Sequence, residues 1–437
     1  MGHLGKLIDP HEALRQRLDR YPVGAPQEEG IHEILSLLFS AEEAAIGASM
    51  PYMPSRIEVV ATHCRTTPAE LQPKLEHMAE RGVVMDFVHP DTGATFWSLA
   101  PTVVGFVELS LSRRRDDLPQ KRLAELYGKY IHTAPFMAGA FTGSTQIGRA
   151  LVREDAIANI ETEVLPYERA TDIIREARTL GVALCYCRHA REHQGHPCAH
   201  PQEACLSLNV AAEYVIRRRH GRRIDAAEAL DILARSRAEG LVQIADNVRQ
   251  RPVFICNCCG CCCDQLRAIS EHGLTRAVVT SNFLAVVASS KCNGCGLCVR
   301  QCPIHAIGGE PKPRVRHSSE ECRPAVVDSN ICLGCGVCVA ACKHGALSMV
   351  PRPHRVLTPE TTLDRLVRMT IERGKLHHAL LGEAAERIPA TFPQRLGSIL
   401  RVTRGDDLRL ADRLRSRFLA WSFGVFRRTV ASHVDWF

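Results

Sequence analysis

The cysteines constrain this chain more than any other feature. The sequence has 20 of them, and 19 lie between Cys185 and Cys342, whereas Cys64 stands apart. A secreted disulfide scaffold is short and follows a signal peptide, but the residues from Met1 to His11 contain no apolar segment of that kind. No apolar run is long enough to predict a membrane span. We therefore expect a cytoplasmic protein whose thiols bind metal.

Length and composition indicate a globular chain of several domains. The chain has 437 residues, of which 45% are hydrophobic and 24% are charged. This is ordinary globular usage, so widespread disorder and collagen-like architecture are excluded. The formal net charge of +7 allows an acidic partner but does not require nucleic acid.

Two copies of one cysteine motif form the most specific pattern. Both copies have the spacing C-x2-C-x2-C-x3-C, and their members are Cys292, Cys295, Cys298 and Cys302, then Cys332, Cys335, Cys338 and Cys342. In such a motif three thiolates bind one [4Fe–4S] cluster, and the fourth, after a short helical step, reaches the neighbouring cluster. We therefore expect Cys342 to join the first three cysteines of the first copy, and Cys302 to join those of the second.

Residues 284–350 resemble a bacterial-type two-cluster ferredoxin. Glycines stand inside both cysteine loops, where the backbone comes close to the sulfides. The runs Phe283–Ala288 and Ala325–Asp328 fit the short strands that precede each loop in that fold. One departure is Lys343, which stands where a proline usually follows the last cysteine. Zinc in both loops is the alternative, but this spacing favours clusters.

A second group of thiols lies earlier in the chain. Its members are Cys185, Cys187, Cys198 and Cys205, and four histidines are interleaved with them: His189, His193, His196 and His200. Four thiols can complete one zinc site, which would only hold a loop-rich segment together, or one further [4Fe–4S] cluster. Because iron–sulfur clusters are expected at the repeated motif, iron is favoured over zinc for this group as well. The histidines are interpreted as bystanders, because four thiols already fill the shell.

A third group follows the expected buried strand Val253–Ile255. Its six thiols are those of Cys256, Cys258, Cys259, Cys261, Cys262 and Cys263. Neighbouring side chains diverge, so these cysteines cannot all reach one ion, and some are expected to be ligands while others are not. Three outcomes stay open: another cubane, a site shared with the second group, or a cluster with an open coordination position. A reduced loop without metal is disfavoured, because exposed thiols oxidise.

The N-terminal residues 28–105 resemble a winged-helix domain. The expected elements are one apolar helical face over 31–46, a helix over 56–63, a helix that Thr67 caps and that runs to Arg81, and strands over 83–88 and 94–99. Many such domains bind DNA. The helix that would enter the groove carries three glutamates against one lysine and one arginine, so docking to a protein is favoured over DNA.

The remaining segments carry weaker patterns. Residues 106–283 form the cysteine-rich region, with a helix expected over Ala226–Glu239. Residues 355–437 read as a helical C-terminal segment. Its apolar stripe consists of Leu410, Leu414, Phe418, Trp421 and Val425. A helix packed on the body is the preferred interpretation. Docking to a membrane surface is the alternative, which nearby aspartates weaken.

Together these parts predict an α+β multidomain chain: a winged-helix-like domain, a cysteine-rich mixed region, a two-cluster module and a helical segment. Motifs and order over residues 30–350 are similar to a group of bacterial 4Fe–4S dicluster-domain proteins, which implies electron transfer but no reaction.

The predicted function is single-electron transfer through two or more [4Fe–4S] clusters. The protein would be a carrier or an oxidoreductase subunit with a donor and an acceptor protein. One or two further Fe–S clusters, or a zinc ion, are expected in the region Cys185–Cys263. A flavin or nicotinamide would belong to a partner chain, because no dinucleotide motif is present. The alternatives are a redox-sensing regulator and an oxidoreductase that binds substrate at Cys256–Cys263. No catalytic residue is assigned, and the oligomeric state stays open.

Overall fold

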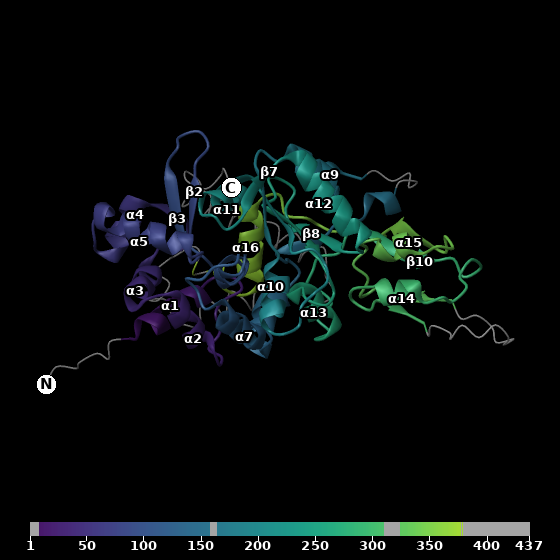
Figure 1. The fold of residues 1–437 in the computed structure, drawn as a ribbon, viewed down its shortest axis with the longest axis horizontal. Helices are drawn as coiled ribbons and strands as arrows, with labels where there is room; N and C mark the ends of the chain where they lie inside the picture. Colours follow the sequence, from purple (N-terminus) through teal and green to yellow (C-terminus); the bar gives the residue numbers. More distant parts are fainter. Residues whose placement is uncertain (1–7, 158–163, 310–323, 377, 379–437) are drawn as a thin grey trace, which may run out of the picture. The chain divides into compact units, whose positions relative to one another are not determined.

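The computed structural model describes residues 8–157, 164–309, 324–376 and 378, and these belong to two units (Figure 1). The first unit comprises Met1–Ser110, Arg114–Thr145 and Thr362–Phe437, and the second comprises Leu111–Arg113 and Gln146–Thr361. Among the described residues, no helix combines the length and the apolar character that crossing a membrane requires.

The first unit is mainly helical. Its helices are α1 (Pro10–Asp19), α2 (Ile31–Leu38), α3 (Ala41–Ser49), α4 (Ile57–Cys64), α5 (Pro68–Glu80), α6 (Val107–Ser110), α7 (Gln120–Tyr130), α8 (Ala134–Phe141) and α16 (Thr362–Glu372). Its strands are β1 (Ser55–Arg56), β2 (Val84–Val88) and β3 (Thr95–Leu99), which form an antiparallel sheet in the order β1–β3–β2.

The predicted cap of the third N-terminal helix is confirmed. The Thr67 hydroxyl accepts a hydrogen bond from the backbone N–H of Glu70 at 3.3 Å, and the Glu70 carboxylate accepts from the backbone N–H of Thr67. Asp225 caps α12 (Ala226–Ala238) in the same way, by accepting from the N–H of Glu228 at 2.8 Å. Such caps satisfy donors that a helix start leaves without intrahelical partners. The predicted hairpin also forms, with β2 antiparallel to β3.

The single helical face predicted over 31–46 is wrong, because two helices lie there. Phe39 is extended, with φ −130° and ψ 132°, and it separates α2 from α3. Ser40 then begins α3 with a capping box, in which its side chain accepts from the N–H of Glu43 and the Glu43 carboxylate accepts from the N–H of Ser40. The apolar pattern continued through this break because Phe39 is itself buried.

Part of the C-terminal segment belongs to the first unit. The Glu372 carboxylate, at the end of α16, accepts hydrogen bonds from the backbone and hydroxyl groups of Ser144 and Thr145. The Lys375 ammonium donates to the carbonyls of Asp19 and Tyr21. Within the segment 355–437, which was predicted to be mostly helical, the described helix is α16, and the apolar stripe expected at 410–425 lies outside the described residues.

The second unit is built on a six-stranded antiparallel sheet in the order β4–β8–β9–β6–β5–β7. These strands are β4 (Gly148–Ala150), β5 (Leu180–Leu184), β6 (Glu203–Leu208), β7 (Arg222–Ile224), β8 (Val242–Asp246) and β9 (Phe254–Cys258). The helices that accompany them are α9 (Ala170–Glu176), α10 (Tyr186–His193), α11 (Asn209–Arg217), α12 and α13 (Asp264–Ser270), with 3-10 turns at Glu154–Ala156 and Pro166–Glu168.

The same unit also contains the repeated cysteine motif. Here the elements are β10 (Phe283–Val287), α14 (Leu297–Gln301), β11 (Ile307–Gly308), β12 (Val326–Val327), α15 (Val337–Ala341) and β13 (Leu347–Pro351). Strand β10 pairs antiparallel with β13, and β11 pairs antiparallel with β12. The two strands predicted before the cysteine loops are therefore present as β10 and β12.

The large sheet has an apolar face and a thiol-bearing face. Helices α9 and α12 pack on the apolar face, where Leu206 of β6 and Ile255 of β9 are buried in the same cluster. Successive side chains of a strand point to opposite faces, so Cys205, Cys256 and Cys258 lie on the other face. Cys205 and Cys256 are direct partners in the β6–β9 pairing. The strand register thus brings together thiols that are far apart in the sequence.

Candidate metal centres

The first candidate centre lies in the loops of the repeated motif. Each loop turns through two glycines with positive φ: Gly294 at 67° and Gly296 at 68°, then Gly334 at 71° and Gly336 at 81°. Glycine adopts this backbone conformation without steric cost, whereas other residues rarely do. Gly296 and Gly336 are the residues that precede α14 and α15, so each loop ends directly in a short helix that carries the third cysteine.

A cavity joins the two copies of the motif. Its lining includes three thiols of the first copy, from Cys292, Cys295 and Cys298, and the last thiol of the second copy, from Cys342. The cavity measures about 480 Å³ when its opening to solvent is included. The spacing argument assigned these four thiols to one cluster. The structure places all four thiols in the lining of this one cavity.

The other four thiols of the motif also lie close together. Burial raises the pKa of the Cys335 thiol to about 12, and the nearby thiols of Cys302 and Cys332 contribute to this rise. Burial likewise raises the pKa of Cys338, with contributions from the same neighbours. Cys302, from the first copy, therefore lies beside the three thiols of the second.

Backbone N–H groups approach the last sulfur of each copy. The N–H of Ala306 donates to Sγ of Cys302 at 3.2 Å, and the N–H of Ala346 donates to Sγ of Cys342 at 3.3 Å. Amide donors of this kind stabilise a thiolate ligand and tune the potential of an iron–sulfur cluster. Eight thiols in two interleaved sets, with amides directed at the sulfurs, fit two [4Fe–4S] clusters.

The second candidate centre is a closed ring of six thiols on the thiol-bearing face of the large sheet. We call it the six-thiol ring. Each of its thiols shifts the pKa of two others, and the order in which they do so is Cys185, Cys187, Cys263, Cys258, Cys256, Cys205 and then Cys185 again. Strands β6 and β9 supply three of these thiols. The others come from the starts of two helices, where Cys185 and Cys263 are the N-cap residues of α10 and α13.

Alternate thiols of the six-thiol ring differ in acidity. The neighbouring thiols of Cys205 and Cys258 lower the pKa of Cys256 to about 6. Neighbouring thiols likewise lower the pKa of Cys185 and Cys263, whereas the pKa values of Cys187, Cys205 and Cys258 are raised. Metal ligation requires thiolates, so metal binding in this ring would release the protons of the three thiols whose pKa is raised.

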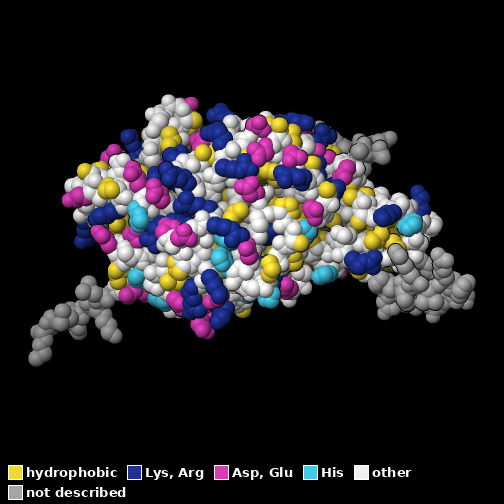
Figure 2. All heavy atoms as spheres, viewed as in Figure 1, with side chains coloured by type: hydrophobic (Ala, Val, Ile, Leu, Met, Phe, Trp, Pro, Cys, Tyr) yellow, Lys and Arg dark blue, Asp and Glu magenta, His cyan; other side chains and the backbone are white. Residues whose placement is uncertain are grey.

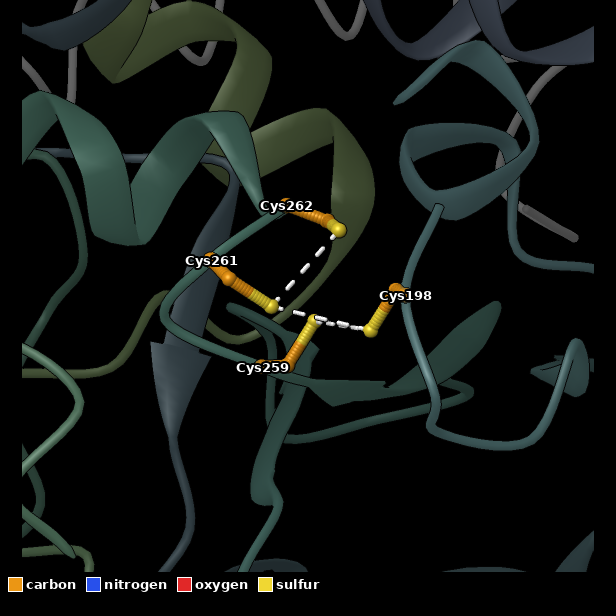
Figure 3. Close-up of side chains that lie close together, drawn as sticks. All are labelled: Cys198, Cys259, Cys261 and Cys262. Atoms are coloured by element: carbon orange, nitrogen blue, oxygen red, sulfur yellow. Dashed lines mark hydrogen bonds between the residues drawn. The ribbon is translucent and has the colours of Figure 1, made fainter. Parts of the chain in front are cut away.

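The third candidate centre is a compact set of four thiols, which we call the four-thiol site (Figure 3). Its members are Cys198, Cys259, Cys261 and Cys262, whose sulfur atoms all lie within 4.8 Å of one another. Cys198 comes from the loop after α10, and the other three come from the loop between β9 and α13 (Figure 3). The Cys259 and Cys262 side chains are buried, whereas Cys261 is exposed to solvent.

Arg188 lies between the six-thiol ring and the four-thiol site. Its side chain is fully buried, and its guanidinium donates to the carbonyl oxygen of Asn257 at 2.7 Å and to that of Pro201. Burial alone would lower the pKa of Arg188, but the negative charges of Cys185 and Cys259 outweigh burial and raise it. The guanidinium therefore offsets thiolate charge in both groups.

The cysteines of residues 256–263 are divided equally between the two groups, with Cys256, Cys258 and Cys263 in the six-thiol ring and Cys259, Cys261 and Cys262 in the four-thiol site. Cys258 belongs to the six-thiol ring and Cys259 to the four-thiol site, and Cys262 and Cys263 are divided in the reverse order. This agrees with the expected divergence of adjacent side chains. Cys261 and Cys262 are an exception, because both reach the four-thiol site with their sulfurs 3.7 Å apart.

The group Cys185–Cys205 does not form one site of its own. Cys198 joins the four-thiol site, and the other three thiols join the six-thiol ring. Of the possibilities open from the sequence, this arrangement is the site shared between the two groups. Among the histidines, His189 and His193 face each other, with their Nε2 atoms 3.1 Å apart, and Nδ1 of His189 is hydrogen-bonded to the Leu111 carbonyl.

One backbone contact joins the four-thiol site to the repeated motif. Gly260 lies between two cysteines of the four-thiol site, and Pro303 follows Cys302 directly in sequence. A Cβ atom on Gly260 would lie 2.5 Å from the carbonyl oxygen of Pro303 and 3.1 Å from its Cα. Only glycine allows the two backbones to approach so closely.

We expect Gly260→Ala to lower the free energy of unfolding of the second unit by about 1–3 kcal/mol, because the added methyl group overlaps backbone that cannot move aside easily. Gly308→Ala is the matched control, since its Cβ would meet no atom closer than 4.0 Å. The measurement is denaturant unfolding of the anaerobic protein followed by visible absorbance. Equal midpoints for the two variants would contradict the close contact.

Comparison with known proteins supports the assignment of the repeated motif. Residues 291–355 match the family model of the 4Fe–4S dicluster domain. No curated protein and no solved structure matches the chain. Together with the grouped cysteines, the domain match indicates an iron–sulfur protein with a role in electron transfer.

Proposed function

We propose that the protein transfers single electrons through two [4Fe–4S] clusters held by the repeated motif, as a carrier or as a subunit of an oxidoreductase. One cluster would be bound by Cys292, Cys295, Cys298 and Cys342, and the other by Cys332, Cys335, Cys338 and Cys302. When bound, such clusters supply one-electron redox chemistry, whose potential the protein tunes by burial and by hydrogen bonds to sulfur.

The observation that carries this proposal is the cavity that Cys342 shares with the first copy of the motif. A structural zinc site is completed by four ligands from nearby loops, whereas an exchanged fourth cysteine is the arrangement of two-cluster ferredoxins. The amide donors at Cys302 and Cys342 support the same interpretation. Backbone N–H groups stabilise thiolate ligands but take no part in acid–base chemistry.

The six-thiol ring is the proposed place of a further iron–sulfur cluster. Four of its six thiols are buried, and Cys205 and Cys256 are half-buried. Six thiols exceed what one tetrahedral ion accepts, and polynuclear centres are the usual metal sites with that many thiolates. Arg188 supplies a buried positive charge beside this ring, which favours a negatively charged centre.

The proposed partners are a donor and an acceptor protein rather than DNA. The N-terminal elements have the order of a winged helix, with α4, α5 and the β2–β3 hairpin in succession. In α5 the Lys74 ammonium is paired with the Glu42 carboxylate at 2.5 Å, which reduces the positive charge available for phosphates. Over the face drawn in Figure 2, Lys and Arg side chains are intermixed with Asp and Glu. A surface of mixed charge supports docking to a protein rather than to the phosphates of DNA.

The experiment is the determination of iron and acid-labile sulfide per chain in protein purified without oxygen, with EPR of the dithionite-reduced sample. We expect about 8 iron and 8 sulfide from the repeated motif, and about 12 or more iron if the six-thiol ring holds a cluster as proposed. Paired, magnetically interacting signals would support two neighbouring clusters. Fewer than about 8 iron with no reducible signal would contradict the proposed function.

A further inference from the structure

We propose that the four-thiol site binds a single zinc ion in a closed tetrahedral shell of four thiolates. The proposal concerns Cys198, Cys259, Cys261 and Cys262 and does not depend on the electron-transfer function. If both proposals hold, the region Cys185–Cys263 contains two kinds of metal centre: a single zinc ion at the four-thiol site and an iron–sulfur cluster at the six-thiol ring.

The distances between the sulfur atoms carry the proposal (Figure 3). Sγ of Cys198 lies 3.8 Å from that of Cys259 and 3.6 Å from that of Cys261, and the sulfurs of Cys261 and Cys262 are 3.7 Å apart. A tetrahedral ion with Zn–S bonds of about 2.3 Å requires an S···S separation of about 3.8 Å. Three of the six S···S separations therefore match one tetrahedron, and the other three are shorter than 4.8 Å.

The thiols of the repeated motif provide a comparison within the same chain. A cubane distributes its four thiolate ligands over four irons, so those sulfurs must stand further apart than around one ion. Among the described residues, the four-thiol site is the group of three or more thiols whose sulfurs all lie within 4.8 Å of one another, and the thiols that line the large cavity do not form such a group. The closer sulfur spacing of the four-thiol site fits a single metal ion, and the wider spacing in the repeated motif fits a cluster.

The donor set favours zinc over mononuclear iron. Zn²⁺ has no preference for a geometry other than the one its ligands impose, and a shell of four cysteines is typical of structural zinc sites. At sites with the same ligands, Zn²⁺ also binds more tightly than Fe²⁺. Four thiolates around Zn²⁺ leave a net negative charge, and the buried guanidinium of Arg188, which is near enough to lower the pKa of Cys259, would partly neutralise it.

The position of the site suggests what the ion does. It would fasten the loop that carries Cys198 to the loop that carries the other three ligands, since these loops are otherwise separated by 60 residues of chain. The second loop contains Gly260, which contacts the backbone of Pro303. The ion would thus fix the segment on which the repeated motif rests, and its role is structural rather than catalytic.

The test is the zinc content of protein purified without oxygen from zinc-containing medium, compared with the Cys261→Ser variant. We expect about one zinc per chain in the unchanged protein and close to none in the variant, with the iron content the same in both. Cys261 is exposed, so its replacement disturbs the fold less than that of a buried ligand. Cys64→Ser is the control, because Cys64 lies in the other unit.

X-ray absorption at the zinc edge of the unchanged protein provides a second measurement that does not depend on a variant. We expect four sulfur neighbours at about 2.3 Å. Nitrogen neighbours would overturn the proposal, because the zinc would then be held by histidines. A loss of about four iron from Cys261→Ser, without any zinc in the unchanged protein, would also overturn it and would assign these thiols to a cluster. Neither result would affect the proposed electron transfer through the repeated motif.

Discussion

Replacing Cys292 and Cys342 together by alanine is expected to remove one cluster and to leave the other intact. The iron content should fall by about four per chain, and the EPR signal of one reduced cluster should persist without magnetic interaction. The reason is that both residues belong to the same set, although they lie in different copies of the motif. Cys342 lines the cavity of the first copy.

Replacing Cys332 and Cys342 by alanine is the matched comparison. This variant removes the same number of thiols, but here they come from one copy of the motif and serve different clusters. We expect no intact cluster to remain. If each copy held its own cluster, the results for the two double variants would be exchanged. Cys64→Ala controls for the loss of a thiol elsewhere, and the measurements are iron analysis and EPR.

Replacing Arg188 by methionine is expected to lower the free energy of unfolding of the second unit by about 3–5 kcal/mol, as is typical when one partner of a buried charge pair is removed. The change removes the charge that faces Cys185 and Cys259. It also leaves the carbonyl oxygens of Pro201 and Asn257 without the guanidinium donor. A buried acceptor without a partner adds to the loss of stability.

The control for Arg188 lies on the same helix. Arg191 is only partly buried and donates to Gln194, also near the helix end. We expect Arg191→Met to change the free energy of unfolding by about 0.5 kcal/mol or less. The measurement is anaerobic denaturant unfolding of both variants, with metal content determined before unfolding. Equal stability of the two variants would show that the thiol groups do not depend on the buried guanidinium.

Local patterns in the sequence predicted the local parts of the fold. The capping box of Thr67 and Glu70 lies within four residues, so the start of α5 could be predicted without knowledge of distant contacts. The break at Phe39 was missed because hydrophobic periodicity continued across it. A signal was available there, since Ser40 and Glu43 have the spacing of a second capping box.

The candidate centres could be predicted to different extents. The exchange of Cys302 and Cys342 follows from a repeated spacing whose geometry is fixed within each loop. The division of the middle thiols could not be predicted, because it depends on the pairing of β6 with β9, which sets Cys205 against Cys256. Register of this kind is a long-range property. The sequence left open a site shared between the two groups, but it could not show that Cys198 lies beside Cys259, Cys261 and Cys262.

The division of residues 256–263 between two centres has a consequence for the kinds of change this segment can accept. Because one short segment supplies three thiols to each centre, it is constrained in its length as well as in its composition. Deleting one residue between Cys258 and Cys261 would shift the positions of the following thiols, which belong to both groups, and would disturb both centres at once. A substitution, by contrast, removes one ligand from one centre. Homologous chains are therefore expected to vary here by replacement and not by insertion or deletion.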